Sequence, residues 1–128
     1  MSYQTLSAES LSAQLPHLAP NERAGLTALV ERLYESYGAD LQRVVLFGSK
    51  ARGDSYNQSD LDLLVVVATS KDNYWRHWNR IVDIIWEIEL EFNFVTSLLI
   101  KNKDDYEAMR QHQSLLAQNI ERDGVNMV

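Results

Sequence analysis

The stretch 46–67 constrains the fold of this chain more than any other part of the sequence. A short apolar run with β-branched residues ends at Gly48-Ser49, which predicts a strand over 43–47 that leads into a turn. A second strand is predicted over 60–67, because its second half is an unbroken apolar run, typical of strands buried on both faces. The spacer between the turn and this strand is long enough for one helical turn and a loop, so the two strands are predicted to be neighbours.

Two carboxylates, Asp60 and Asp62, open the second predicted strand. Side chains on a strand repeat every two residues, so both carboxylates project from one face, roughly 6.5 Å apart along the strand. Paired carboxylates beside a buried sheet are unfavourable for stability but well suited to hold a divalent cation. Asp60 and Asp62 are therefore the candidate metal ligands and catalytic residues.

The Gly48-Ser49 turn is the candidate phosphate site. Gly48 has no Cβ, so a phosphate can approach the backbone closely, and Ser49 offers a hydroxyl beside exposed N–H groups. A short helix expected over 50–53 would direct further N–H groups at the same anion. Lys50 and Arg52 add positive charge there, and only Arg52 has the planar fork that suits bidentate phosphate contact.

The order Gly48-Ser49, spacer, Asp60-x-Asp62 resembles the signature of the nucleotidyltransferase superfamily of DNA polymerase β. It is most similar to the minimal nucleotidyltransferase branch, whose members are single-domain proteins often encoded beside a HEPN-domain partner as antitoxin and toxin. The resemblance extends over roughly 24–125. It implies a polymerase β-like α/β (α+β) fold, in which helices flank a small mixed sheet and the active site lies at the end of the two central strands.

The resemblance also implies a reaction and a division of roles. Asp60 and Asp62 would hold Mg²⁺ bridged to the triphosphate of ATP, and AMP would pass to an acceptor hydroxyl as pyrophosphate leaves. Gly48 and Ser49 would bind the β- and γ-phosphates, with Arg52 as a neutralising contact. In the antitoxin branch, the implied acceptor is a tyrosine of a HEPN-domain ribonuclease toxin, which adenylylation silences.

The strand predicted over 94–100 departs from the family pattern. The superfamily commonly carries a third carboxylate there, and the register that we infer places Val95 at that position. No Asp or Glu occurs between Phe92 and Lys103. The departure argues against a second metal ion and leaves the general base unassigned.

Two alternative functions remain open. The first is a catalytically weak or inactive antitoxin that neutralises its partner by occlusion, using a tryptophan-bearing helix and the chain ends. The second is a small-molecule nucleotidyltransferase that acts on an aminoglycoside-like hydroxyl. Such enzymes usually need an added domain or a dimer to build the acceptor pocket, and whether this chain forms a homo- or hetero-oligomer is left open.

Length, charge and composition bear on the number of domains, the kind of partner and the localisation of the chain. A chain of 128 residues is expected to form one domain, with a lead-in over 1–19 and a core over 20–125. The net charge of −6 argues against extensive nucleic-acid binding. The sequence has no cysteine and no apolar run long enough to span a membrane, which favours a cytoplasmic protein.

The other elements follow from apolar spacing and from helix-ending residues. Helices are predicted over 20–37, 74–91 and 103–122, with a break or kink at 111–114, and a short helix is expected over 7–14. The helix over 74–91 carries three tryptophans. Core packing is favoured for Trp78, whereas Trp75 and Trp86 are left undecided between the core and a partner-binding face.

Overall fold

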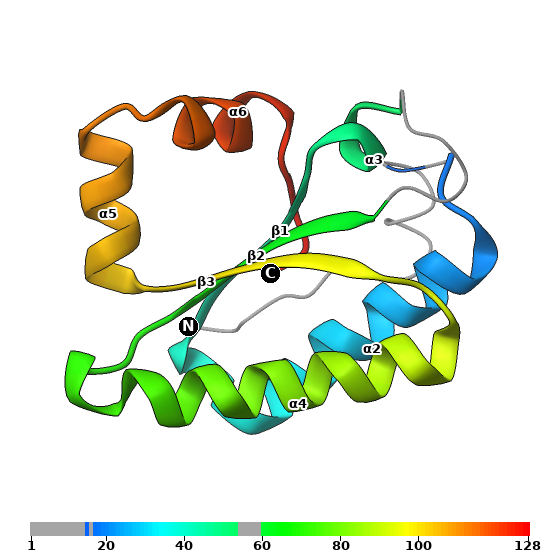
Figure 1. The fold of residues 1–128 in the computed structure, drawn as a ribbon, viewed down its shortest axis with the longest axis horizontal. Coiled ribbons are helices and arrows are strands. Elements are labelled where there is room, and N and C mark those ends of the chain that lie inside the picture. Colours follow the sequence, from blue (N-terminus) through cyan, green and yellow to red (C-terminus); the bar gives the residue numbers. More distant parts are fainter. Residues whose placement is uncertain (1–14, 16, 54–59) are drawn as a thin grey trace.

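A computed structural model describes residues 15, 17–53 and 60–128 of the chain, and in it one mixed sheet lies between two layers of helices (Figure 1). The sheet order is β3-β2-β1-β4. Strand β2 runs parallel to β3 and antiparallel to β1, and β4 pairs antiparallel with β1. The elements are α2 (Pro20–Tyr37), the 3-10 turn Gly38–Asp40, β1 (Leu41–Phe47), α3 (Ser49–Arg52), β2 (Leu61–Val67), the 3-10 turn Lys71–Asn73, α4 (Tyr74–Phe92), β3 (Thr96–Asn102), α5 (Lys103–Gln111), α6 (Leu115–Asp123) and β4 (Val125–Asn126).

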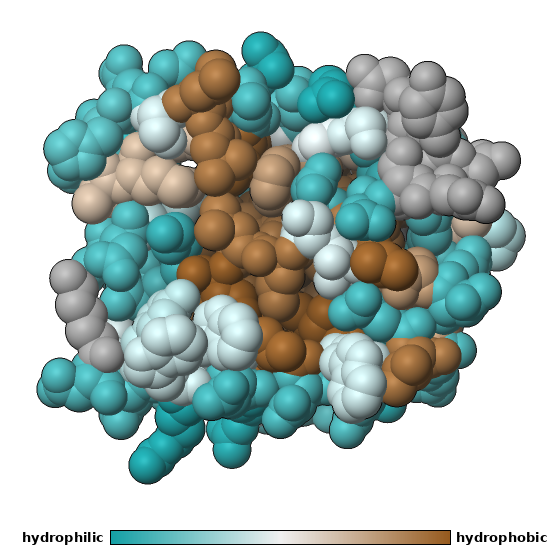
Figure 2. Space-filling view, viewed as in Figure 1, coloured by the Kyte–Doolittle hydropathy of each residue, from teal (hydrophilic) through white to brown (hydrophobic). Residues whose placement is uncertain are grey.

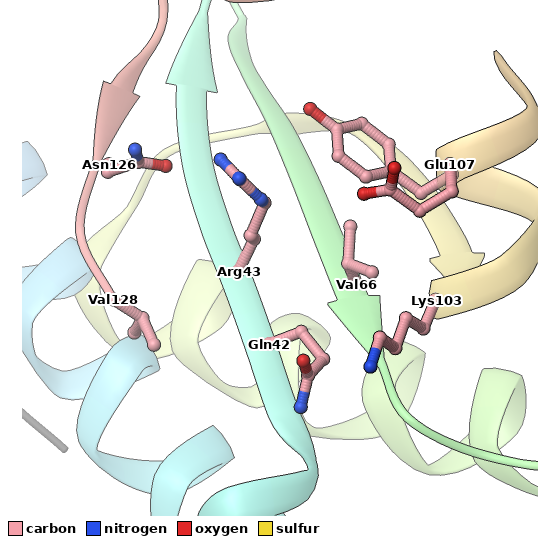
Figure 3. A pocket seen from close by; sticks show the side chains of 8 residues that line it. Gln42, Arg43, Val66, Lys103, Glu107, Asn126 and Val128 are labelled. Carbon is pink, nitrogen blue, oxygen red and sulfur yellow. The ribbon is translucent and has the colours of Figure 1, made fainter. Parts of the chain in front are cut away.

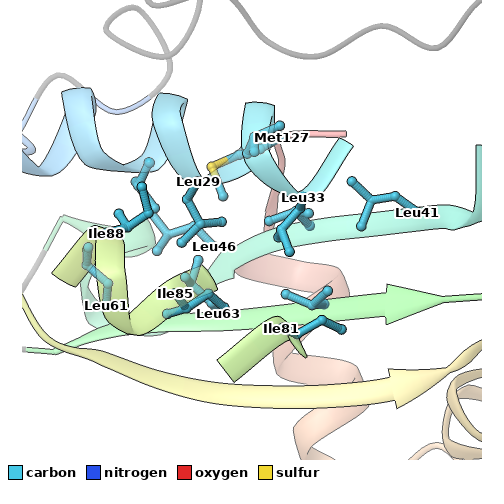
Figure 4. Packing of buried hydrophobic residues seen from close by; sticks show 14 of the residues in the cluster. Leu29, Leu33, Leu41, Leu46, Leu61, Leu63, Ile81, Ile85, Ile88 and Met127 are labelled. Carbon is cyan, nitrogen blue, oxygen red and sulfur yellow. The ribbon is translucent and has the colours of Figure 1, made fainter. Parts of the chain in front are cut away.

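The larger core lies between the sheet and helices α2 and α4. Helix α2 contributes Leu29 and Leu33, and α4 contributes its isoleucines, of which Ile85 packs on the centre of the sheet (Figure 4). A smaller core on the opposite face places Tyr106 of α5 and Ile120 of α6 against β1 and β2. Strand β2 is covered on both faces, as its unbroken apolar sequence predicts, and the mixed α/β fold class is confirmed.

Helix α4 resolves the question about the tryptophans. Its isoleucines face the core, and Trp78 packs partly against it. Trp75 and Trp86 remain 69% and 61% exposed, so neither belongs to the core. Asn93 caps the helix and adopts a left-handed conformation with φ of 60°. Asparagine tolerates that conformation better than most residues, so the helix ends at Phe92, one residue after the predicted end.

Several predicted boundaries need correction. Strand β1 begins at Leu41 rather than at 43, and β3 begins at Thr96 rather than at 94. The break predicted at 111–114 is confirmed, since α5 ends at Gln111 and Ser114 accepts a hydrogen bond from the Ala117 N–H at the start of α6. The two-residue strand β4 was not predicted, and the helix expected over 7–14 lies outside the described residues.

Within the described ranges, no helix has the length and hydrophobicity of a membrane span.

Candidate active site

The turn after β1 lies directly against the carboxylate of Asp62. Strands β1 and β2 pair so that Phe47 stands opposite Asp62, and Gly48 follows with φ of +76°. A Cβ added to Gly48 would lie 2.1 Å from Oδ2 of Asp62, closer than any real contact. Glycine is therefore required here both by the backbone conformation and by the approach of the carboxylate.

The electrostatics of Asp62 show which charged groups gather around the Gly48 turn. We call this region, which contains Gly48, Arg52, Asp60 and Asp62, the carboxylate corner. Burial is the main cause that raises the pKa of the Asp62 carboxyl above its ordinary value, and the nearby Asp60 carboxylate raises it further. The Arg52 guanidinium and a hydrogen bond with Ser97 act in the opposite direction and lower the pKa of Asp62. The structure thus brings Asp60, Asp62, Gly48 and Arg52 to one end of the sheet, where α3 adjoins the start of β2 (Figure 1).

Strand β3 lies beside Asp62 on the side of β2 that faces away from the Gly48 turn. Asp62 stands beside Ser97 in the parallel ladder, and the carbonyl of Val95 accepts the Leu61 N–H at 2.9 Å. By the two-residue repeat, positions 95 and 97 lie on the face of the sheet that carries Asp60 and Asp62. Neither is acidic, and the described part of the chain contains no cluster of three or more His, Cys, Asp or Glu side chains suited to a metal ion.

Sequence reasoning did not identify Ser97 as part of the site. The missing information was the register of β3 against β2, which depends on where β3 begins. Once Thr96 is known to pair with Leu61, the same alternation that places Asp62 in the corner places Ser97 there as well.

Lys50 requires a correction, because it does not point into the corner. Its side chain is 5% exposed, and its ammonium lies 3.0 Å from the carboxylate of Glu22 on α2, which is 7% exposed. His17 also bonds to the Lys50 backbone carbonyl. An ammonium enclosed and paired in this way is not available to a phosphate; it attaches α3 to α2 instead.

Arg52 remains beside the turn. Its side chain is 40% exposed, and its Nη1 lies 3.6 Å from Oδ2 of Asp123 at the end of α6. The pKa of Asp123 is lowered first by a hydrogen bond from Arg122, with a smaller contribution from Arg52. The end of α6 is thus linked to the turn, a contact that the sequence analysis did not predict. Ser49, the first residue of α3, is half-buried at the same turn.

The Glu22–Lys50 pair should contribute measurably to stability. We expect Glu22→Gln to lower the free energy of unfolding by about 2 kcal/mol, because the buried ammonium of Lys50 loses its countercharge while glutamine keeps an oxygen for the Ala19 N–H. Urea unfolding measures this loss. The double variant Glu22→Gln with Lys50→Met should recover most of it, and a double variant no more stable than the single one would contradict the explanation.

The raised pKa of Asp62 predicts a pH dependence of stability. The folded state binds this proton more tightly than the unfolded state, whose carboxyl has the ordinary value of 3.8. The stabilisation is therefore complete below that value and is lost as the pH rises through the folded-state pKa. We expect Asp62→Asn to gain stability relative to the wild type as the pH rises from 3.8 through the folded-state pKa of Asp62, measured by urea unfolding. Asp72→Asn, which makes the same change at an exposed position, is the control.

A separate cavity of about 340 Å³ lies at the other end of the sheet (Figure 3). Arg43 of β1, Val66 of β2 and Lys103 of α5 line it, and the Arg43 guanidinium lies 5.6 Å from the centre of the Tyr106 ring. Because Val66 is near the end of β2 and Asp62 near its start, this cavity is not part of the carboxylate corner. Its lining lacks the paired carboxylates that a metal–triphosphate needs.

Comparison with known proteins gives consistent matches. The family model described as polymerase beta, nucleotidyltransferase, matches residues 30–128. A relative from Methanocaldococcus jannaschii, named for an inferred protein adenylyltransferase activity, is 26% identical over 84 residues, or 66% of this chain and 77% of the relative.

Two solved structures resemble the fold. An inferred nucleotidyltransferase from Sulfolobus solfataricus superposes with a TM-score of 0.52 at 20% identity, covering 98% of this chain and 90% of its own. A chain of a toxin–antitoxin complex with AMP-PNP superposes with a TM-score of 0.51 at 22% identity, and the match covers 78% of this chain and 70% of that chain. At these identities the likeness concerns the fold.

Proposed function

Because this chain belongs to the polymerase β nucleotidyltransferase family and is a nucleotidyltransferase, we propose that it transfers AMP from ATP to a hydroxyl group of a protein. The observation that carries the proposal is the contact between the Gly48 turn and the Asp62 carboxylate, with Asp60 beside it. A phosphate-binding turn and a pair of carboxylates at one point are what a metal–triphosphate requires.

The residues at the corner fit Mg²⁺. Burial and the neighbouring Asp60 charge raise the pKa of Asp62, and a bound cation would relieve that repulsion. Mg²⁺ usually takes one or two protein carboxylates together with phosphate oxygens and water, which suits a site that offers Asp60 and Asp62 and lacks a third acidic ligand among the described residues. When bound, Mg²⁺ neutralises charge on the triphosphate and on the departing pyrophosphate.

The chain's own groups then position the nucleotide. We assign Gly48 and Ser49 to the β- and γ-phosphates, since the turn presents backbone without a Cβ and a hydroxyl beside it. Arg52 adds positive charge on the same side, held by Asp123. Asp60 is exposed at the start of β2, on the side from which an acceptor can approach. The acceptor oxygen bonds to the α-phosphorus and gives up its proton to solvent, the bond from the α-phosphorus to the bridging oxygen breaks, and pyrophosphate leaves.

The acceptor that we propose is a tyrosine of a HEPN-domain toxin, acted on in the cytoplasm, where ATP is available. Two findings support a protein acceptor and a toxin partner. A relative carries the name of a protein adenylyltransferase, and a structure of the same fold belongs to a toxin–antitoxin complex crystallised with AMP-PNP. The binding-only antitoxin is the second candidate, favoured by Val95 at the position where the inferred register predicts the family's third carboxylate.

The decisive experiment incubates the protein with α-labelled ATP, Mg²⁺ and the protein encoded by the neighbouring gene. Label on that protein, lost when its tyrosines are replaced by phenylalanine, supports the proposal. Neutralisation of the toxin without label transfer, unchanged in Asp60→Asn, would instead support occlusion. Label on an aminoglycoside but on no protein would assign the acceptor to small molecules.

A further inference from the structure

Strand β3 leaves one edge of the sheet open, because it is the last strand in the order β3-β2-β1-β4 (Figure 1). Figure 2, drawn from the same side, shows that apolar side chains gather in the middle of the view, where Figure 1 shows the strands. None of the groups assigned so far to the nucleotide uses this edge.

One flank of helix α4 borders the open edge. On the other flank, Glu87 and Glu91 form ion pairs with Arg32 of α2. Because the side chains of a helix repeat every 3.6 residues, the flank turned away from α2 carries Trp75, Trp78, Val82 and Trp86. The first and last of these are exposed, and the other two pack partly against the core. We call these four residues the tryptophan flank.

The hydrogen bonds between β2 and β3 fix which backbone groups of β3 point to the open edge. Leu61 of β2 is level with Thr96 and donates its N–H to the Val95 carbonyl, one level earlier. Both backbone groups of a residue in a parallel ladder point to the same side, and successive residues alternate between the two sides. The odd-numbered residues of β3 therefore face β2, and Thr96, Leu98 and Ile100 point their N–H and carbonyl groups outward.

Helix α4 already binds two of these outward groups. The Thr96 N–H donates to the Glu89 carboxylate at 3.3 Å, and the Ile100 carbonyl accepts the Tyr74 hydroxyl at 3.2 Å. In the part of the chain that the structure describes, the remaining outward groups have no hydrogen-bond partner: the Thr96 carbonyl, both groups of Leu98 and the Ile100 N–H. Unpaired groups on an edge strand are a template for another strand.

A strand that runs parallel to β3 would use these remaining groups and no others. In a parallel ladder, a residue donates its N–H to the neighbouring residue one level earlier and accepts the N–H of the neighbouring residue one level later. A docked residue level with Ser97 would bond to the Thr96 carbonyl and the Leu98 N–H. A docked residue level with Leu99 would bond to the Leu98 carbonyl and the Ile100 N–H.

An antiparallel strand does not fit these groups, because its residues exchange both hydrogen bonds with one partner residue. A strand that paired in this way with Thr96 would need the N–H that Glu89 already holds. The same conflict occurs at Ile100, whose carbonyl is held by Tyr74. Two β3 strands that meet about a two-fold axis perpendicular to the sheet run antiparallel, so the pattern favours an extended segment of a different protein over the β3 strand of a second copy.

A docked parallel strand would extend the row of residues that contains Asp62. Residues at the same level in neighbouring strands project from the same face of the sheet. Asp62 is level with Ser97, so the docked residue at that level projects from the face that carries Asp62. Two strand spacings, roughly 10 Å, separate the two backbones. A tyrosine side chain at this position can therefore bring its hydroxyl to the carboxylate corner.

The next docked residue projects from the opposite face, toward α4. It is level with Leu98, whose side chain packs against the core between the sheet and α4. Its own side chain lies beyond Leu98, beside the tryptophan flank. An apolar side chain is favoured there in proportion to the area that it removes from water. The edge therefore suits a hydroxyl-bearing residue followed by an apolar one.

We propose that the open edge of β3 binds the acceptor segment of the partner protein as an extended strand parallel to β3. The acceptor tyrosine is level with Ser97, and the apolar residue after it lies on the tryptophan flank. The backbone hydrogen bonds supply affinity, and the alternate side chains supply specificity. The role of acceptor rests on the proposed function, whereas the strand pairing rests on β3 and α4 alone.

The experiment adds a blocked hexapeptide, Ser-Thr-Tyr-Leu-Thr-Ser, to the isotope-labelled full chain. At saturation we expect hydrogen exchange of the Leu98 and Ile100 amides to slow about tenfold or more. The Thr96 amide, already bonded to Glu89, should keep its rate. The peptide Ser-Thr-Leu-Tyr-Thr-Ser, with the same composition in reversed order, should bind about tenfold more weakly or worse.

Two backbone-methylated peptides test the hydrogen bonds directly. N-methylation of the tyrosine removes the donor to the Thr96 carbonyl and should weaken binding about tenfold or more. N-methylation of the leucine, whose N–H points away from β3, is the matched control and should leave the affinity of the parent peptide unchanged. In the protein, Trp86→Ser should weaken binding about fivefold, whereas Tyr34→Ser on α2 should not weaken it.

Label transfer separates this inference from the proposed function. With α-labelled ATP and Mg²⁺, the parent peptide should take up label on its tyrosine, and the version with phenylalanine should not. If the peptide docks and the protein encoded by the neighbouring gene takes up label while the peptide does not, the edge does not present the acceptor. Docking without label on any acceptor contradicts the proposed function and leaves the strand pairing supported.

The strand pairing has its own contrary outcomes. It is overturned when millimolar peptide leaves the Leu98 and Ile100 amides unprotected, or when methylation of the tyrosine and of the leucine weakens binding equally. Protection of these amides that rises with protein concentration in the absence of peptide would assign the edge to a second copy of the chain, and would overturn the proposal too.

Discussion

Replacing Asp62 with asparagine is expected to lower the rate of AMP transfer by about 10³-fold or more. The carboxylate at this position lies against the Gly48 turn, where the proposed metal–triphosphate would bind. A divalent cation contributes several kcal/mol of charge stabilisation in the transition state, and an amide is a poor replacement for a charged ligand. The measurement is the initial rate of label transfer from ATP under saturating Mg²⁺.

Thermal unfolding separates this loss from a loss of structure. Wild-type protein should unfold at a higher temperature when Mg²⁺ and a nonhydrolysable ATP analogue are added, whereas Asp62→Asn should show little change. Without ligand, the variant should be at least as stable as the wild type, since it removes a like-charge pair with Asp60. Asp72→Asn is the matched control. Transfer by Asp62→Asn within tenfold of the wild type would remove Asp62 from the catalytic site.

The parts of the site that the sequence predicts are those fixed by local spacing. The two-residue repeat of a strand is enough to place Asp60 and Asp62 on one face, and a glycine before a short helix is enough to predict an open turn. That these two features meet depends on the pairing of Phe47 with Asp62, which follows once β1 and β2 are neighbours.

The features that the sequence does not predict depend on distant partners. Lys50 is adjacent to the phosphate motif, but its ammonium is paired with Glu22 on another helix, and no local pattern indicates this. Ser97 enters the site only through the register of a parallel ladder. Strand β4 is too short to have a pattern of its own, and exists because it pairs with β1.

Helix α4 illustrates a limit of amphipathic patterns. Its apolar stripe is wider than the surface that the sheet and α2 cover, so periodicity alone cannot say which part of the stripe is buried. The isoleucines lie on the covered part, and Trp75 and Trp86 lie beyond it. The excess width of the stripe is itself a sign of a second contact surface.

Replacing Gly48 with alanine is expected to abolish measurable ATP binding and to cost about 3 kcal/mol or more in the free energy of unfolding. Two independent effects add here. A residue with a side chain is strained at φ of +76°, and the new Cβ would lie 2.1 Å from Oδ2 of Asp62, so either the turn or the carboxylate must move. Calorimetric titration with a nonhydrolysable ATP analogue and Mg²⁺ measures the first loss, and urea unfolding measures the second.

Two comparisons isolate the contact with Asp62 from the backbone strain. Gly38→Ala provides the control, because Gly38 also has a positive φ, of 54°, but no atom lies within 4 Å of a Cβ placed there. That variant should lose stability through strain alone and keep its affinity for the nucleotide. In the double variant Gly48→Ala with Asp62→Ala, the collision is relieved, so part of the lost stability should return while ATP binding stays absent. If Gly48→Ala binds ATP as tightly as Gly38→Ala does, the turn and the carboxylate do not form one site, and the nucleotide must bind elsewhere on the molecule.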